Sequence, residues 1–316
     1  MKTSPYLNIK RIEIVVTNRC NGQCLHCSAA ENSHMLSRAC IDANETAKVI
    51  QTLTQMFRVQ SVMTFGGEPL LFPAAACTVH RAATDSGVPV RQVITNGCFA
   101  KDSAYLAKTA KQLQAAGVNE ILLSVDAFHQ KTLPLARVHT FAKSARACGI
   151  PNICLHPAWV VERTHPNEYN RQTEQLLRAF SDLSLPVTQG NNIFLEGRAK
   201  KALAPYYPKT QPAANAPCGT QPYTEPLDKV QTLSLTPQGE VMVCAFVIGN
   251  FYHEDVKTIL SRYDPYRDRF MRALLMGGAA ALVKEAQKDG IFVPPGAQST
   301  CALCRAVNRK RRDFVL

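Results

Sequence analysis

The chain has 316 residues, of which 46% are hydrophobic and 19% charged, and its formal net charge is +12. This is the composition of a globular protein with a large core. It contains no apolar run of about 18 residues, which excludes a membrane-spanning helix, and residues 1–11 lack the apolar segment of a signal peptide. We therefore expect a cytoplasmic protein.

The positive charge is dispersed, apart from the basic run at 309–312. Such a surface suits an acidic partner. We find no nucleic-acid-binding motif and no internal repeat, so nucleic acid is not an expected partner.

Strands and helices are predicted to alternate through the first two thirds of the chain. The predicted strands cover residues 11–17, 60–65, 89–95, 119–125, 152–160 and 186–195. The predicted helices between them cover about residues 42–57, 73–86, 102–117, 134–149 and 167–183. This alternation favours a parallel sheet with helical crossovers. We predict an α/β fold, a partial (β/α)6 TIM-like barrel.

Three cysteines follow the first predicted strand at the spacing C-x3-C-x2-C, namely Cys20, Cys24 and Cys27. Thiolates are soft ligands that favour zinc, copper(I) or iron–sulfur clusters. A structural zinc site needs four protein ligands, and His26 could supply the fourth. A four-iron cluster held by three thiolates would instead keep one iron open. With twelve cysteines in a reducing compartment, metal is a better explanation than disulfides.

Other polar groups follow the next predicted strands. Gly66-Gly67-Glu68-Pro69 ends the second strand and offers exposed backbone and a carboxylate, which suit an ammonium group. Asn96 follows the third strand, and Ser124 and Asp126 lie at the end of the fourth. In parallel barrels the chemistry gathers at the carboxyl ends of the strands. The alternatives are turn formation by Asn96 and helix capping by Ser124 and Asp126.

The cysteine motif together with Gly-Gly-Glu-Pro resembles the signature of the radical SAM superfamily. In that family three cysteines hold a [4Fe–4S] cluster, and S-adenosylmethionine (SAM) chelates the fourth iron. Reductive cleavage of SAM gives a 5′-deoxyadenosyl radical that abstracts hydrogen from the substrate. The resemblance implies that Cys20, Cys24 and Cys27 are the cluster ligands. It further implies that SAM contacts the residues Gly66, Gly67, Glu68, Pro69, Asn96, Ser124, Asp126 and Arg198.

Arg198 lies in Glu-Gly-Arg-Ala, which looks like a family element whose arginine pairs with the SAM carboxylate. The alternative is a solvated surface charge. His129, in Asp-Ala-Phe-His-Gln, has no assigned role, and a capping or solvent-facing histidine is its simplest interpretation.

The remainder of the chain is predicted as a second domain, residues 201–316, after a barrel domain of residues 1–200. A linker to residue 226 precedes a β-hairpin of residues 230–235 and 240–243, and a helix of about residues 265–286 follows. Four cysteines of this region could converge on a closed metal site, Cys218, Cys244, Cys301 and Cys304. The region resembles the auxiliary-cluster region of SPASM and twitch radical SAM enzymes, which implies one auxiliary [4Fe–4S] cluster. A structural zinc is the alternative.

The resemblance implies a radical SAM enzyme, and we expect it to mature a ribosomally made peptide by epimerisation or crosslinking. A small-molecule substrate is the second hypothesis, and a non-catalytic iron–sulfur or zinc-binding protein is the third. If the reaction is epimerisation, a thiol should return hydrogen to the substrate radical. Cys98 is preferred for this role over Cys148 and Cys154 because it follows the third predicted strand. A flavodoxin or ferredoxin is the expected reducing partner.

Overall fold

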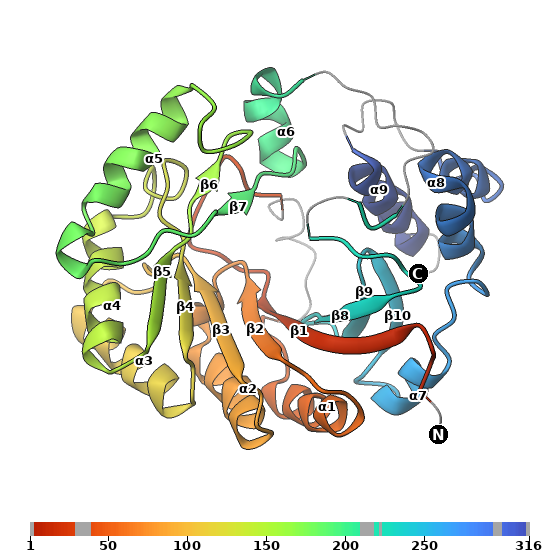
Figure 1. Ribbon diagram of the computed structural model, residues 1–316, viewed down its shortest axis with the longest axis horizontal. Helices are drawn as coiled ribbons and strands as arrows, with labels where there is room; N and C mark the ends of the chain where they lie inside the picture. Colours follow the sequence, from red (N-terminus) through yellow and green to blue (C-terminus); the bar gives the residue numbers. More distant parts are fainter. Residues whose placement is uncertain (1–2, 29–38, 209–217, 221–222, 293–298, 314–316) are drawn as a thin grey trace. The chain divides into compact units, whose positions relative to one another are not determined.

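The computed structural model describes residues 3–28, 39–208, 218–220, 223–292 and 299–313 (Figure 1). The side chains of residues 312 and 313 are not described. The chain divides into two compact units, which we call the barrel unit and the C-terminal unit. The barrel unit comprises Arg11–Tyr207 and Leu235–Gly239. The C-terminal unit comprises Met1–Lys10, Pro208–Ser234 and Glu240–Leu316.

Five parallel strands form the sheet of the barrel unit, in the order β1-β2-β3-β4-β5 (Figure 1). Their bounds are β1 Leu7–Thr17, β2 Ser61–Gly66, β3 Val90–Thr95, β4 Glu120–Leu123 and β5 Asn152–Leu155. The predicted α/β class with a parallel sheet is confirmed. Because the strands are parallel, all five carboxyl ends lie at one edge of the sheet.

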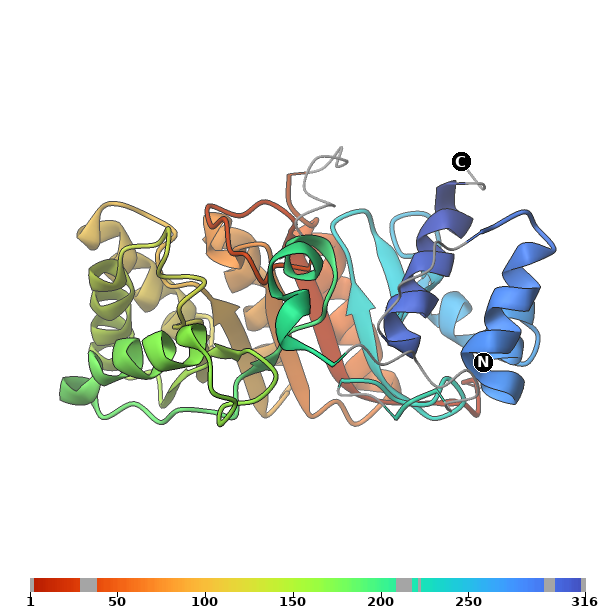
Figure 2. The same cartoon turned by 90° about the horizontal axis from the view of Figure 1, so that it is seen from above.

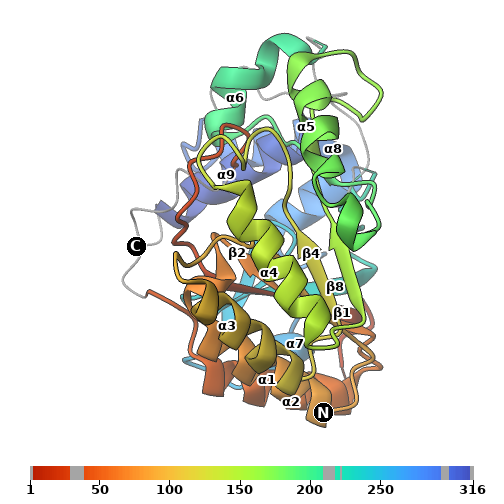
Figure 3. The ribbon, with the colours of Figure 1, turned by 90° about the vertical axis from the view of Figure 1, so that its left-hand side faces the viewer.

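Helices follow the strands and cover one face of this sheet. They are α1 Ala43–Met56, α2 Pro73–Asp85, α3 Ser103–Ala115, α4 Leu135–Ala147 and α5 Glu168–Arg178. Neighbouring helices from α1 to α4 pack side by side, as Figure 3 shows for α3 and α4. Two of the predicted helix starts are confirmed by their caps, since the side chains of Asp42 and Asp102 accept hydrogen bonds from the first turns of α1 and α3.

The core of the barrel unit lies between the sheet and these helices. In β1, Ile12, Ile14 and Val16 are fully buried, whereas the intervening residues Glu13 and Val15 are half-buried. This period of two places alternate side chains on opposite faces of the sheet. The second face of the sheet is therefore free to carry polar groups.

The extents predicted for the fifth and sixth strands are wrong. The fifth is broken at Pro157 into β5 and the short β6 Ala158–Trp159, because proline cannot donate a ladder hydrogen bond. In place of a sixth strand there is an isolated bridge at Val187 and the two-residue β7 Asn191–Asn192, which pairs with β6. Gly190 turns the chain between them with φ of 83°, and a β-carbon there would lie 2.2 Å from the Pro157 carbonyl oxygen.

The predicted linker also begins later than expected. Residues Gly197–Leu203 form α6, and a 3₁₀ turn follows at Ala204–Tyr206. Ala199 and Leu203 are buried, so packing of this short helix overrides the loop composition that follows it. Part of the linker, residues 209–217 and 221–222, lies outside the described residues.

The C-terminal unit contains three adjacent strands, β8 Val230–Leu235, β9 Glu240–Val243 and β10 Phe246–Asn250. The first two match the predicted hairpin, and β10 adds an antiparallel strand that was not predicted. The turn between β9 and β10 is Cys244-Ala245, which has neither the Asn-Gly pair nor the single Gly that is typical of two-residue hairpin loops. Cys244 nevertheless has a left-handed φ of 52°.

Three helices complete the C-terminal unit, α7 Val256–Ser261, α8 Arg269–Gln287 and α9 Thr300–Asp313. The start of α8 lies a turn later than predicted, because the Asp268 carboxylate caps it by accepting from the N–H groups of Phe270 and Met271. Helices α8 and α9 pack together (Figure 2). Within the described part of the chain, none of the helices combines the length and apolarity needed to cross a bilayer.

Candidate functional site

The three cysteines of the first motif lie on the loop that follows β1, which we call the cysteine loop (residues 18–28). The Gly22 N–H donates to Cys20 Sγ at 3.3 Å. A β-carbon at Gly22 would lie 3.4 Å from Cys24 Sγ and 3.5 Å from Cys20 Sγ. The two sulfurs therefore lie on either side of the position that a side chain at Gly22 would occupy. The Cys27 N–H donates to the Cys24 carbonyl at 3.2 Å, so the backbone turns between these two cysteines.

The Gly-Gly-Glu-Pro segment packs directly against the start of this loop. The Gly67 N–H donates to the Thr17 carbonyl at 2.7 Å, and the Glu68 N–H donates to the Arg19 carbonyl at 2.9 Å. β-Carbons at Gly66 and Gly67 would lie 2.4 Å and 2.1 Å from those two carbonyl oxygens. Both glycines are thus required for close approach of the two backbones, which fixes where the cysteine loop begins.

The Glu68 carboxylate is fully buried and joins β2 to β3. It accepts hydrogen bonds from the Leu70 N–H at 2.9 Å, the Thr95 hydroxyl at 2.7 Å and the Asn96 N–H at 2.7 Å. Burial raises the pKa of Glu68 to about 7, although these three donors act in the opposite direction. Pro69 begins the 3₁₀ helix Pro69–Leu71 that Glu68 caps. The carboxylate is therefore a structural clamp at the sheet edge as well as a candidate SAM contact.

Asn96 ties the end of β3 to the cysteine loop. Its Nδ2 donates to Asn21 Oδ1 at 2.9 Å, and its Oδ1 accepts from the Cys98 N–H at 2.8 Å. Asn21 in turn donates to the Cys98 carbonyl at 2.7 Å. The sequence analysis missed Asn21, whose only signal was its position between Cys20 and Gly22. Asn96 therefore forms a turn, the alternative proposed for it, through its hydrogen bond with the Cys98 N–H, and it also contacts the cysteine loop through Asn21.

Asp126 is fully buried at the end of β4, where its carboxylate organises the following turn. It accepts from the backbone N–H groups of Phe128 at 3.0 Å, His129 at 2.9 Å and Ala158 at 3.0 Å. It also accepts from His129 Nδ1 at 2.8 Å. Burial alone would raise the pKa of Asp126, but the His129 imidazole outweighs it and lowers that pKa. The same ion pair raises the pKa of His129 well above its ordinary value, against the effect of burial.

The imidazole of His129 lies against the cysteine loop. Ligand atoms of Cys24, His26 and His129 all lie within 4.8 Å of one another. The His26 ring stands 4.9 Å from the rings of both His129 and Phe128. Its buried Nδ1 has no hydrogen-bond partner among the described residues. Burial lowers the pKa of His26 to about 4. This favours the neutral imidazole, which can accept a hydrogen bond or bind a metal.

Ser124 and Arg198 lie at the same edge of the barrel unit. Ser124 is buried, and its N–H donates to the Thr95 carbonyl at 2.9 Å. Arg198 begins α6, and its N–H donates to the Cys27 carbonyl at 3.3 Å. Gly197 has φ of 54°, and a β-carbon there would lie 2.9 Å from the same carbonyl oxygen. The Gly-Arg-Ala element therefore packs on the third cysteine of the loop.

Cys98, the expected hydrogen donor, lies in the apolar core between the sheet and helices and is 3% exposed. Cys148 is the C-cap of α4. Cys154 alternates with the buried residues Ile153 and Leu155 and so faces the other side of the sheet. Of the three candidate thiols, Cys154 is the one on the face opposite the helices.

A row of polar side chains crosses that opposite face. Arg11 pairs with Glu13 at 2.9 Å on β1, and its Nη1 donates to Gln92 Oε1 on β3 at 3.0 Å. Gln92 donates in turn to Glu120 on β4. Register places Gln92 opposite Glu120, so these groups form one continuous row across neighbouring strands. The sequence analysis missed this row because each member is an ordinary strand residue.

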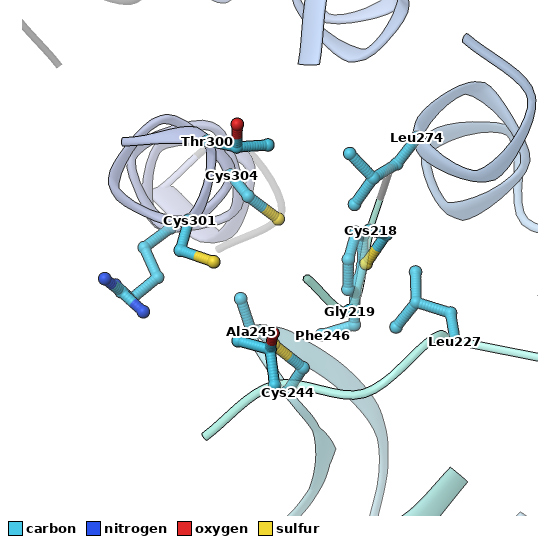
Figure 4. Close-up of a pocket in the computed structure, with 12 residues that line it drawn as sticks. Cys218, Gly219, Leu227, Cys244, Ala245, Phe246, Leu274, Thr300, Cys301 and Cys304 are labelled. Atoms are coloured by element: carbon cyan, nitrogen blue, oxygen red, sulfur yellow. The ribbon is translucent and has the colours of Figure 1, made fainter. Parts of the chain in front are cut away.

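In the C-terminal unit, the structure brings together all four cysteines proposed for the auxiliary site. Cys218, Cys244, Cys301 and Cys304 line one pocket, and Figure 4 shows their sulfurs turned toward a common space. Leu227, Leu274 and Phe246 supply apolar walls. The C-x2-C pair lies on the first turns of α9. This geometry is suited to one closed four-thiolate site.

The thiols of this pocket have raised pKa values. Burial, followed by the neighbouring thiols, raises the pKa of Cys218 to about 12 and raises the pKa of Cys244 and of Cys304. Burial therefore favours the neutral thiols of Cys218 and Cys304. A bound metal would supply the positive charge that stabilises the thiolates.

Comparison with known proteins finds a family match over part of the chain. The profile of the "Radical SAM superfamily" matches residues 14–150, which include the cysteine loop and Gly66–Pro69. The chain carries a radical SAM domain. The structure of native anSMEcpe with bound AdoMet covers 98% of this chain and 99% of its own, with a TM-score of 0.55 at 13% identity. The match to the complex of BtrN with AdoMet and 2-DOIA covers 86% of this chain and 89% of the BtrN chain, with a TM-score of 0.50 at 16% identity.

The similarity to curated proteins is confined to part of the chain. The GTP 3',8-cyclase of Limosilactobacillus fermentum is 31% identical over 118 residues, which are 37% of this chain and 33% of that protein. The enzyme of the same name from Streptomyces coelicolor is 29% identical over 116 residues, or 36% and 32% of the two chains. The chain therefore spans about a third of the length of these relatives.

Proposed function

We propose that this protein is a radical SAM enzyme whose [4Fe–4S] cluster is held by Cys20, Cys24 and Cys27. The observation that carries the proposal is the packing of the cysteine loop. Cys20 Sγ and Cys24 Sγ flank Gly22, and Gly67 anchors the start of the loop through close backbone contact. Three soft donors on one loop fit a cluster with one open iron. When bound, the cluster and SAM supply a 5′-deoxyadenosyl radical that abstracts hydrogen from the substrate.

The remaining residues at this edge have proposed roles toward SAM. We propose that the backbone of Gly66–Pro69 contacts its amino group and that Arg198 pairs with its carboxylate. Ser124 is proposed as a further polar contact. Glu68, Asn96 and Asp126 act chiefly by fixing the surrounding backbone, because their side chains already accept or donate two or more hydrogen bonds within the fold.

A second metal centre is proposed at Cys218, Cys244, Cys301 and Cys304. Their convergence in one pocket supports an auxiliary [4Fe–4S] cluster of the twitch type. Four thiolates also suit zinc. Iron and zinc analysis separates these two outcomes.

A small polar molecule is the substrate class that we propose. The curated relatives are named for action on GTP, and BtrN is in complex with 2-DOIA. Peptide maturation, the expectation from the family resemblance and the net positive charge, finds no support in these relatives. A flavodoxin or ferredoxin as reductant and a cytoplasmic location remain proposals of the same kind.

The test is metal content after anaerobic reconstitution with iron and sulfide. We expect about eight irons in the parent, and about four in either Cys20/Cys24/Cys27→Ala or Cys218/Cys244→Ala. Cys77→Ala, which removes a thiol in α2, is the matched control and should retain the parent content. Stoichiometric zinc in place of iron at the cysteine loop would contradict the proposal and leave a zinc-binding protein.

A further inference from the structure

The cysteine loop crosses the carboxyl ends of three neighbouring strands in order. The carbonyl of Arg19 accepts a backbone hydrogen bond from the segment after β2 at 2.9 Å. Asn21 Nδ2 donates to the Cys98 carbonyl, in the segment after β3, at 2.7 Å. The Gln23 N–H donates to the Thr132 hydroxyl, in the segment that leads from β4 into α4, at 3.5 Å (Figure 3). The loop therefore runs along one edge of the barrel unit, with Arg19, Asn21 and Gln23 exposed.

Three basic side chains accompany the exposed side of this loop. Arg19 belongs to the loop itself, Lys101 follows Cys98 by three residues, and Lys131 directly precedes Thr132. All three are exposed. Three residues of chain span at most about 11 Å, so Lys101 stays close to the contact between Cys98 and the loop. We call Arg19, Lys101 and Lys131 the basic edge.

The basic edge has little negative charge to balance it. Within the cysteine loop, residues 96–102 and residues 124–134, the exposed carboxylate is that of Asp102, which caps α3. The other acidic residue of these segments, Asp126, is fully buried. None of the three basic side chains forms an ion pair within the described part of the chain. The edge therefore presents three positive charges beside one exposed negative charge.

An exposed aromatic ring lies next to the basic edge. Tyr105 is in the first turn of α3, four residues after Lys101, and is 41% exposed. Its ring contacts the buried ring of Phe99, with the two centroids 6.5 Å apart. Tyrosine and arginine are enriched in protein–protein interfaces, where charged side chains lie mainly at the rim. A supported tyrosine bordered by basic side chains thus suits the surface of an acidic protein.

We propose that the basic edge is the docking surface for a small acidic electron-carrier protein, which reduces the cluster through the exposed side of the cysteine loop. The inference rests on the proposed function, since it takes the cluster to be held by this loop. The carrier loses one electron and the cluster gains it. SAM cleavage consumes that electron as its sulfur–carbon bond breaks to give methionine and the 5′-deoxyadenosyl radical. Docking here keeps the electron's path short, because the loop that carries the thiols is itself the surface.

The basic side chains of α8 and α9 are a weaker candidate for this role. Arg311 pairs with Asp268 at 3.0 Å, and Arg269 pairs with Glu285 at 3.5 Å. Lys288 pairs with the same glutamate at 2.6 Å. These positive charges are balanced within the C-terminal unit, whereas those of the basic edge remain available to a partner. Electrostatic complementarity of that kind guides encounter and orientation more than it adds affinity.

The first test is crosslinking of the reconstituted full-length protein to a flavodoxin and, separately, to a ferredoxin. A carbodiimide joins a lysine amine directly to a carboxylate with loss of water, and mass spectrometry locates the link. Lys101 and Lys131 should carry the links, whereas Lys111 and Lys143 should not. These two control lysines are exposed on α3 and α4, each eight residues after the first residue of its helix, which is about 12 Å along the axis.

The second test is the affinity for the same two carriers, measured by calorimetry at about 50 mM and about 300 mM salt. Lys101→Glu/Lys131→Glu should bind about tenfold more weakly than the parent at the lower salt. The difference should shrink at the higher salt, because exposed charges are screened. Lys111→Glu/Lys143→Glu has the same net charge and should stay within about twofold of the parent. Formation of 5′-deoxyadenosine with dithionite, which needs no docked protein, should be equal in all three proteins.

Three results would overturn the inference. They are failure of the parent to bind either carrier, equal weakening in the two double variants, and crosslinks at Lys111 or Lys143 in place of Lys101 and Lys131. The crosslinking result uses the parent alone and so holds even if a variant fails to fold. Absence of 5′-deoxyadenosine from the parent with dithionite would instead reject the proposed function.

Discussion

Acid should destabilise the barrel unit through His80, a fully buried histidine of α2. Its Nε2 pairs with the Thr64 hydroxyl at 2.9 Å, and its Nδ1 has no partner within the described residues. Burial lowers the pKa of His80 to about 3, and the neighbouring Arg91 contributes in the same direction. The folded protein therefore holds this imidazole neutral.

The sign and size of the effect follow from linkage. In the unfolded chain the histidine takes up a proton below its ordinary pKa of about 6.5, whereas the folded protein resists protonation until about pH 3. Between these values the unfolded state binds more protons, so stability falls as the pH falls. The loss is about 1.4 kcal/mol per pH unit, or about 2 kcal/mol between pH 7 and pH 5.

The assay is urea denaturation of the parent and of Thr64→Val/His80→Leu at pH 7, 6 and 5, at equal metal loading. The double variant replaces both partners with apolar groups of similar size, which avoids an unpaired hydroxyl. Other titrating groups and the metal centres are common to both proteins. Their contribution cancels in the difference of the two free energies of unfolding.

We expect the parent to lose about 2 kcal/mol more than the double variant between pH 7 and pH 5. Thr64→Val alone keeps the histidine and should keep the parent's pH dependence. Parallel pH profiles for the parent and the double variant would refute the reasoning, since His80 would then not be the group that resists protonation.

Three further predictions concern the metal sites. Gly67→Ala places a β-carbon 2.1 Å from the Arg19 carbonyl oxygen. We expect the free energy of unfolding, measured by thermal unfolding, to fall by about 3 kcal/mol and the reconstituted variant to hold about four fewer irons. The iron content of the parent in this variant would contradict the prediction. Asn21→Ala removes two hydrogen bonds of the cysteine loop and should cost about 2 kcal/mol, measured by urea denaturation, with Asn44→Ala on the surface as control. Metal binding at the pocket of Cys218 should release protons, because burial raises the pKa of that thiol. Calorimetry in two buffers of different ionisation enthalpy measures the number of protons released. Metal binding without proton release would contradict the prediction.

Local patterns predicted the first four strands and most of the helix starts of the barrel unit. The alternation of Ile12, Ile14 and Val16 is a property of a few adjacent residues, and burial follows from it directly. The caps at Asp42 and Asp102 are equally local. The positions of Cys20 and Gly66 after successive strands then placed them at one sheet edge, because parallel strands share that edge.

The parts that were missed depend on contacts between distant segments. Asn21 is bound to Asn96, 75 residues away, and no local pattern marks such a pair. His129 likewise comes close to Cys24 only when the turn after β4 meets the cysteine loop. In the C-terminal unit β10 was missed because Cys244 takes a left-handed conformation that cysteine seldom adopts.

The measurement that tests the central claim most directly is SAM cleavage. The reconstituted protein is mixed with SAM and dithionite under anaerobic conditions, and 5′-deoxyadenosine and methionine are quantified by mass spectrometry. We predict that the parent and Cys77→Ala release both products and that Cys20/Cys24/Cys27→Ala releases neither. No 5′-deoxyadenosine from an iron-loaded parent, or equal amounts from the triple variant, would contradict a radical SAM site at the cysteine loop.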